Sequence, residues 1–227
     1  MQLQYVYLAP ICLVIAAVFI VVEKTKAYLV ADVIKGVASA FFVALGVLSA
    51  IGCADAPLAR MVILGLVLGA VADVLLNLRY VYEGKKGQLA FLAGILVFLA
   101  GHVAYLLAIL SRCPHPVFAI CAGVVLTALL MWWILSNVEA SLAFKLFGIV
   151  YIGAITVLNC VALSVLAVSP LPHWMMFLAG TFLFLVSDVI LIFNTFGESS
   201  RFSWRVANLM LYYVGQLLIA FSLQLPV

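Results

Sequence analysis

The sequence predicts an all-α membrane protein with eight transmembrane helices. Of its 227 residues, 69% are hydrophobic and only 8% are charged, and its mean hydropathy is +1.37. Soluble domains carry about a quarter charged residues, so this composition excludes an ordinary soluble protein. The chain also lacks the alternating polar and apolar residues that form outer-membrane barrels, so we expect the spans to be helices.

A spanning helix needs about 20 mostly apolar residues, and eight stretches meet this requirement. In chain order they are residues 3–22, 28–51, 58–78, 89–110, 117–135, 142–168, 174–193 and 204–223. The first stretch has no basic leader and no small-residue cleavage site, which favours a retained helix. No linker or soluble domain separates the stretches, so residues 1–227 are predicted to form one transmembrane domain.

Charged and turn-forming residues lie between the stretches. Residues 79–88 form the longest connection on the predicted cytoplasmic side, and Glu83, Gly84, Lys85 and Lys86 within it indicate a solvated turn. The Pro-Leu-Pro segment 170–172 indicates a turn before the seventh stretch. The acids at the connections, which include Glu23 and Asp55, are interpreted as ordinary solvated charges.

The Lys and Arg residues favour one set of connections. Those after the first, third, fifth and seventh helices hold Lys24, Lys26, Arg79, Lys85, Lys86, Lys145, Arg201 and Arg205. The opposite side holds only Arg60 and Arg112, and Lys35 lies within a span. Cytoplasmic connections are enriched in Lys and Arg. The bias therefore predicts both termini on the non-cytoplasmic side, in the inner membrane if the source is a bacterium.

Two apolar stretches each contain one aspartate in a matching setting. In GLVLGAVADVLLNL (65–78) and GTFLFLVSDVILIF (180–193), Asp73 and Asp188 follow a glycine by eight residues and precede Val-(Leu/Ile)-Leu. They fall at similar depths in the third and seventh helices, which run in the same direction. The pattern predicts two four-helix halves in a weak parallel repeat.

Buried acids of this kind usually mark function. A carboxylate in the membrane costs about 2.5–3.5 kcal/mol on insertion scales, so it normally faces a cavity or a partner. The alternative is that each acid is protonated, or hydrogen-bonded between helices, for packing alone. Gly65 and Gly69 lie on the same helical face as Asp73 and Asn77. Small residues at this spacing are interpreted as packing residues that turn the acid inward.

Other polar residues in the spans predict a wet pocket that both acids face and that opens toward the cytoplasm. Lys35 has two interpretations, which the sequence leaves even. One is a structural lysine that snorkels or pairs with Asp32, and the other is a cation for a lipid phosphate or for one of the acids. The further candidates are Asn77, His102, Tyr105, Tyr151, Asn159, Ser187, Asn194, Tyr212, Tyr213 and Gln216.

No metal or cofactor is expected. One His and two distant acids lack the spacing of a metal site. The five cysteines likewise show no ligand spacing. A disulfide between Cys53 and Cys113, which would share the outer face, is less favoured than packing within helices. Hydrolase and nucleotide-binding motifs such as G-x-S-x-G and the Walker loop are absent from the sequence.

Four segments together resemble the YhhN family of membrane proteins, which includes the lysoplasmalogenases. They are GAVADVLL, AGHVAYLLAIL, GTFLFLVSDVILIFNTF and LMLYYVGQLLIAF. The resemblance implies hydrolysis of the vinyl-ether bond of lysoplasmalogens to a fatty aldehyde and glycerophosphoethanolamine or glycerophosphocholine. The positions that match the family's polar residues are Lys35, Asp73, His102, Tyr105, Tyr151, Ser187, Asp188, Tyr212, Tyr213 and Gln216.

The acid pair suits this reaction, because one carboxylic acid would protonate the vinyl ether and an ionised carboxylate would stabilise the resulting cation. The partners expected are a single-chain ether lysophospholipid and membrane lipids, with no nucleic acid; the oligomeric state is left open. The competing hypothesis is a proton-coupled transporter or a lipid-binding membrane protein without hydrolase activity. Paired acids and parallel repeats also suit transport.

Overall fold

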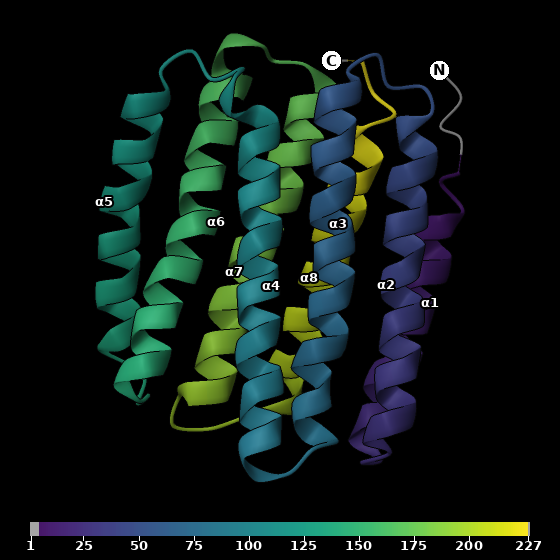
Figure 1. The fold of residues 1–227 in the computed structure, drawn as a ribbon, viewed down its shortest axis with the longest axis vertical. Helices are drawn as coiled ribbons and strands as arrows, with labels where there is room; N and C mark the ends of the chain where they lie inside the picture. Colours follow the sequence, from purple (N-terminus) through teal and green to yellow (C-terminus); the bar gives the residue numbers. More distant parts are fainter. Residues whose placement is uncertain (1–4, 227) are drawn as a thin grey trace.

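The computed structural model describes residues 5–226, which form a bundle of eight α-helices (Figure 1). The helices are α1 (Leu8–Lys24), α2 (Tyr28–Ala50), α3 (Ala56–Asn77), α4 (Gly84–Leu110), α5 (Pro116–Leu135), α6 (Leu142–Val168), α7 (Pro172–Phe196) and α8 (Phe202–Ser222). A 3-10 turn, η1 (Leu78–Tyr80), continues α3. Each predicted stretch overlaps one of these helices, although the helices extend beyond most of the stretches by one to five residues and residues 3–4 of the first stretch lie outside the described residues.

The predicted solvated turn before the fourth helix is partly wrong. Helix α4 begins at Gly84, so Lys85 and Lys86 lie in its first turn. Apolar runs mark only the part of a helix that lies in the membrane, whereas the backbone hydrogen bonds continue into the polar ends. Gly84 has a φ of 60°, a left-handed conformation that glycine adopts without strain. The reversal between α3 and α4 therefore occurs in residues 81–83.

Six helices, α2 to α7, are long and apolar enough to cross a membrane, as expected of a multi-pass integral membrane protein. Helix α1 has 17 residues, which is short for a span. Helix α8 carries Asn208, Tyr212, Tyr213 and Gln216, polar residues that lower its mean hydropathy. All four are buried in the protein interior. The crossing of the membrane by α1 and α8 stays a prediction.

Proline and aspartate residues fix several helix starts. Pro57, Pro116 and Pro172 lie in the first turns of α3, α5 and α7, where a missing N–H costs little. The Asp55 carboxylate caps α3 by accepting a 3.0 Å hydrogen bond from the Leu58 amide. Asp55 also pairs with Arg112, which follows α4, so it is not the solvated charge that the sequence suggested.

The close helix contacts rely on glycine. A Cβ atom on Gly180 of α7 would lie only 2.7 Å from the carbonyl oxygen of Gly215 in α8. A Cβ on Gly101 of α4 would lie 3.3 Å from the carbonyl oxygen of Gly65 in α3. The side chain of Gln216 occupies the space beside Gly69. These contacts confirm the interpretation of the glycines as packing residues.

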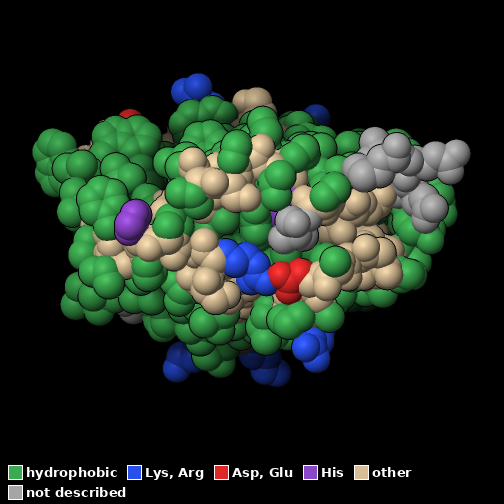
Figure 2. Space-filling view, turned by 90° about the horizontal axis from the view of Figure 1, so that it is seen from above, with side chains coloured by type: hydrophobic (Ala, Val, Ile, Leu, Met, Phe, Trp, Pro, Cys, Tyr) green, Lys and Arg blue, Asp and Glu red, His purple; other side chains and the backbone are tan. Residues whose placement is uncertain are grey.

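Helix α8 lies inside the bundle, against α1, α2, α3 and α7, whereas α5 lies at one edge against α6 (Figure 1). Helix α1 begins and α8 ends at the same end of the bundle. Seen from that end, the molecule is covered mostly by hydrophobic side chains and shows few charged groups (Figure 2). Which end faces the cytoplasm stays a prediction.

Candidate functional site

Asp73 is held by charged and hydroxyl donors from two other helices. Its Oδ1 lies 3.0 Å from Lys35 Nζ of α2. Its Oδ2 accepts hydrogen bonds from Ser39 Oγ of α2 at 2.6 Å and from the Tyr212 hydroxyl of α8 at 2.7 Å. The residue is only 2% exposed. A cation and two hydroxyl donors thus contact the two carboxyl oxygens of Asp73.

Lys35 lies beside one of the two acids. The amine is 4% exposed, so it does not snorkel to a surface, and the ion-pair partner it has among residues 5–226 is Asp73. It also donates a 3.1 Å hydrogen bond to the Asp73 carbonyl oxygen. Lys35 therefore joins α2 to α3 directly beside the acid. Asp32 is also buried, and its Oδ1 has no hydrogen-bond partner.

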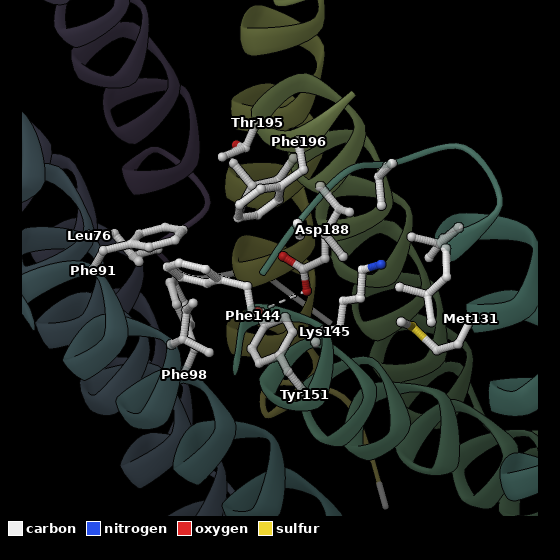
Figure 3. Close-up of a pocket in the computed structure, with 18 residues that line it drawn as sticks. Leu76, Phe91, Phe98, Met131, Phe144, Lys145, Tyr151, Asp188, Thr195 and Phe196 are labelled. Atoms are coloured by element: carbon white, nitrogen blue, oxygen red, sulfur yellow. Dashed lines mark hydrogen bonds between the residues drawn. The ribbon is translucent and has the colours of Figure 1, made fainter. Parts of the chain in front are cut away.

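Asp188 has different neighbours. Its Oδ2 accepts one hydrogen bond, from the Tyr151 hydroxyl of α6 at 3.0 Å (Figure 3). His102 Nε2 of α4 lies 3.9 Å from the same oxygen, beyond hydrogen-bond distance. The His102 ring packs against Tyr151 and Phe184, with ring centroids 5.1 and 4.7 Å away, and neither ring nitrogen has a hydrogen-bond partner. Asp188 thus lies among aromatic rings, and none of the Lys and Arg side chains of residues 5–226 pairs with it within 4.0 Å. Lys145 of α6 lines a cavity together with Asp188 but forms no ion pair with it (Figure 3).

Both acids line one polar cavity of about 440 Å³, a volume that includes its open side. Phe98 and Phe184 also line it, and their rings meet edge to face with centroids 5.6 Å apart. The remaining polar and charged residues of the lining are Lys35, Asn77, Arg79, Ser187, Arg205, Asn208 and Tyr212. The structure thus places both predicted acids, together with four of the other candidates, around one space.

A second, mostly apolar cavity of about 730 Å³, a volume that also includes its open side, adjoins the first (Figure 3). Residues of α4, α5, α6 and α7 surround it, among them Phe91, Met131 and Phe144. Among the described residues, the two linings share Leu76, Phe91, Phe98, Leu191 and Asp188. Of these five, Asp188 alone is polar. It therefore stands where an apolar chamber meets a polar one.

Several sequence candidates form a supporting layer. The Tyr105 hydroxyl donates to Gln216 Oε1 at 2.8 Å, and Gln216 Nε2 donates to the Tyr212 oxygen at 3.3 Å. The Tyr213 hydroxyl lies 3.4 Å from Ser39 Oγ. Because Tyr212 and Ser39 both contact Asp73, these residues fix the groups that hold the acid.

Other sequence candidates lie between helices. Ser187 donates to the Asn208 carbonyl oxygen at 2.9 Å, and the Asn208 amide donates back to Ser187 at 2.8 Å, which ties α7 to α8. Asn159 and Thr181 form a similar tie between α6 and α7. Asn194 lines neither cavity; its side-chain oxygen accepts the Arg201 amide at 2.7 Å and closes the α7–α8 connection.

The sequence did not single out four residues that the structure brings to the polar site: Ser39, Arg79, Arg205 and Asn208. Both arginines were interpreted as loop charges. Arg205 forms a two-point ion pair with Glu23, at 2.7 and 3.0 Å, so the solvated interpretation of Glu23 is also wrong. The available signal was position, since Arg79 directly follows the third apolar stretch and Arg205 lies in the first turn of the eighth.

Residues 5–226 contain no group of three or more His, Cys, Asp or Glu side chains that could hold a metal ion. All five cysteines are free, including Cys53 and Cys113.

The fold and the site define a multi-pass α-helical membrane protein with two acids around a buried polar cavity. The model of the YhhN family matches residues 30–223. The chain therefore belongs to the YhhN family. No curated protein and no solved structure matched it.

Proposed function

We propose that the protein is a lysoplasmalogenase, which hydrolyses the vinyl-ether bond of a lysoplasmalogen to a fatty aldehyde and a glycerophospho-alcohol. One observation carries the proposal: Asp188 is the polar residue common to an apolar and a polar cavity. In a lysoplasmalogen the vinyl ether joins an apolar chain to a polar glycerophosphate. A lipid with its chain in the first cavity and its head in the second would bring that bond to Asp188. Membership of a family that includes lysoplasmalogenases agrees with this.

Asp188 is the proposed general acid. A carboxyl group with one hydroxyl donor, aromatic neighbours and no Lys or Arg partner retains its proton more readily than one paired with a cation. It transfers this proton to the β-carbon of the vinyl ether, and the C=C electron pair forms the new C–H bond. The remaining cation is an oxocarbenium ion, in which the ether oxygen shares the positive charge.

Asp73 is the proposed electrostatic partner. Its contacts with Lys35, Ser39 and Tyr212 keep a carboxylate in place in the cavity where the cation develops. Water adds to the oxocarbenium carbon and returns a proton to the Asp188 carboxylate. The hemiacetal then collapses to the aldehyde and the free glycerol hydroxyl, so one water is consumed for each bond cleaved. The faces of Phe98 and Phe184 add cation–π stabilisation.

The test is aldehyde release by purified protein in detergent. We expect a lysoplasmalogen to react and the saturated alkyl-ether lysolipid of the same chain length to remain intact, because it has no double bond to protonate. In D₂O, the aldehyde should carry one deuterium on the carbon next to its carbonyl group. Preformed aldehyde incubated with protein in D₂O is the control for exchange.

Two outcomes would count against the proposal. Aldehyde without deuterium would exclude protonation on carbon. A protein that releases no aldehyde but moves lysolipid across the membrane of proteoliposomes would be a transporter. That assay separates the two hypotheses, because hydrolysis in detergent needs no second compartment.

A further inference from the structure

We propose that Arg79, Asn77 and Arg205 form a subsite for the phosphodiester group of a lysolipid. All three line the polar cavity together with Asp188. The proposal deepens the function given above, since it names the group by which the head of the substrate is held.

Arg79 supplies a cation without a counter-ion. Its guanidinium carbon lies 4.4 Å from the ring centroid of Phe91 and 4.6 Å from that of Tyr80, so aromatic faces hold it in place. It donates a hydrogen bond to the Tyr80 hydroxyl. Among residues 5–226, the Lys and Arg side chains that pair with a carboxylate within 4.0 Å are Lys35, Arg112 and Arg205. Arg79 is therefore the cation of the polar cavity whose charge the protein leaves uncompensated.

Asn77 gives an independent indication of a ligand. It is 1% exposed, and among residues 5–226 neither its Nδ2 nor its Oδ1 makes a hydrogen bond of good geometry; the buried acid Asp32 is the polar side chain that interacts with it. A buried polar group without a partner costs about 1–3 kcal/mol, so native structures rarely keep one unless something else binds there. The residue follows Asp73 by one helical turn on α3 and lines the same cavity as Arg79. Its amide would donate to a phosphate oxygen.

The charge balance fits a phosphodiester. Among the charged residues that line the polar cavity, Lys35 is paired with Asp73 and Arg205 with Glu23, and Asp188 is the proposed proton donor. With Asp188 protonated, the lining is left with the single positive charge of Arg79; Asp32, the other buried acid near Asn77, lies outside the lining. A phosphodiester carries one negative charge, and the planar guanidinium fork matches two of its oxygens. Arg205 uses Nε and Nη2 for Glu23, so its Nη1 supplies a further donor. The recognised substrate class is therefore a lysolipid with a phosphodiester head, and not an alkenylglycerol without phosphate.

Binding of an unreactive lipid tests the subsite without relying on hydrolysis. The probes are 1-O-alkyl-glycerophosphoethanolamine and the 1-O-alkylglycerol of the same chain length, measured by titration calorimetry with purified protein in detergent. We expect Arg79→Gln to weaken binding of the phospholipid by about tenfold to a hundredfold, the range for a charge-assisted hydrogen bond. Its affinity for the alkylglycerol should be unchanged, which also shows that the variant is folded.

Two further variants sharpen the result. Arg79→Lys keeps the positive charge but loses the planar guanidinium group, so its affinity for the phospholipid should lie between those of wild type and Arg79→Gln. Arg201→Gln removes an exposed arginine that is outside the polar cavity lining, and it should bind both probes as wild type does. If Arg79→Gln lost affinity for both probes equally, or lost affinity for neither, the subsite proposal would be overturned. Inorganic phosphate that binds wild type as tightly as the lipid would show a site for free phosphate and overturn the lipid assignment.

The subsite and the hydrolase proposal can fail separately. Phosphate-dependent binding in a protein that releases no aldehyde would leave the subsite intact. Normal hydrolysis with an unchanged KM in Arg79→Gln would overturn the subsite alone, since loss of uniform substrate binding raises KM.

Discussion

The ammonium group of Lys35 lies 3.0 Å from Asp73 Oδ1, and both side chains are at least 96% shielded from solvent. The pair joins two helices at the edge of the polar cavity. Its energetics differ from those of a surface salt bridge, because removal of one partner leaves the other charge buried without a counter-ion.

Lys35→Met should destabilise the protein strongly, by about 3–5 kcal/mol, because it leaves Asp73 buried without its cation. Adding Asp73→Asn should recover most of the loss, since no uncompensated charge remains. Thermal unfolding in detergent, followed by tryptophan fluorescence, measures both variants. A double variant as unstable as the sum of the two singles would mean that the residues act independently.

Asp188→Asn should lower aldehyde release by about 10²–10⁴-fold, the usual contribution of a positioned general acid. Asparagine keeps the size of the side chain but cannot deliver the proton. Tyr151→Phe, which removes only the hydroxyl bound to Asp188, is the matched control and should lose less activity. If Asp188→Asn keeps near-normal release while folded, Asp188 is structural.

The two acids should act as a unit. Asp73→Asn alone should also lose most activity, and the double variant Asp73→Asn with Asp188→Asn should be little worse than either single change. Steady-state rates with one lysoplasmalogen provide the comparison. Losses that multiply in the double variant would show separate contributions.

Gly180→Ala should destabilise the α7–α8 contact, because the added methyl group would lie 2.7 Å from the Gly215 carbonyl oxygen, a backbone atom that cannot move aside. Gly148→Ala in α6 is the control. Its methyl group would meet only the end of Met131, at 4.0 Å, and alanine favours a helix by about 1 kcal/mol over glycine. The thermal midpoint should therefore fall for the first variant and stay level or rise for the second.

The Asp55–Arg112 pair should make stability depend on acid pH. Burial alone would raise the pKa of Asp55, but the hydrogen bond from Leu58 and the Arg112 guanidinium lower it below its ordinary value of 3.8. A lowered pKa in the folded state stabilises the protein above pH 3.8, and this stabilisation is lost as pH falls through the folded pKa. The difference in thermal midpoint between wild type and Asp55→Asn should thus be full at pH 6 and shrink below about pH 4.

The sequence was sufficient to predict the existence of the eight helices and to single out Asp73 and Asp188. Long apolar runs have one stable form in a membrane, which is why each predicted stretch overlaps a helix. Asp73 and Asp188 stood out because an acid in such a run is costly. The start of α4 was missed because Lys85 and Lys86 lie beyond the apolar run but within the same helix.

The partners of the acids were not accessible from the sequence alone. Hydropathy does not fix the rotation of one helix against another, so Lys35 had two equal interpretations until α2 was placed beside α3. Ser39 gave no signal because serine is common at helix contacts in membranes. Arg79 looked like a loop charge, since nothing in the linear order shows its guanidinium lying over Phe91.

The contacts of the two acids also have a consequence for how the chain enters the membrane during synthesis. Lys35 and Ser39 precede Asp73 in the chain, and His102 and Tyr151 precede Asp188. Each acid therefore leaves the ribosome after at least one of the residues that contact it in the folded protein. Tyr212 lies on the last helix, so its hydrogen bond to Asp73 can form only after α8 has been synthesised. A nascent chain that stops short of α8 thus has both acids accommodated but no finished polar cavity.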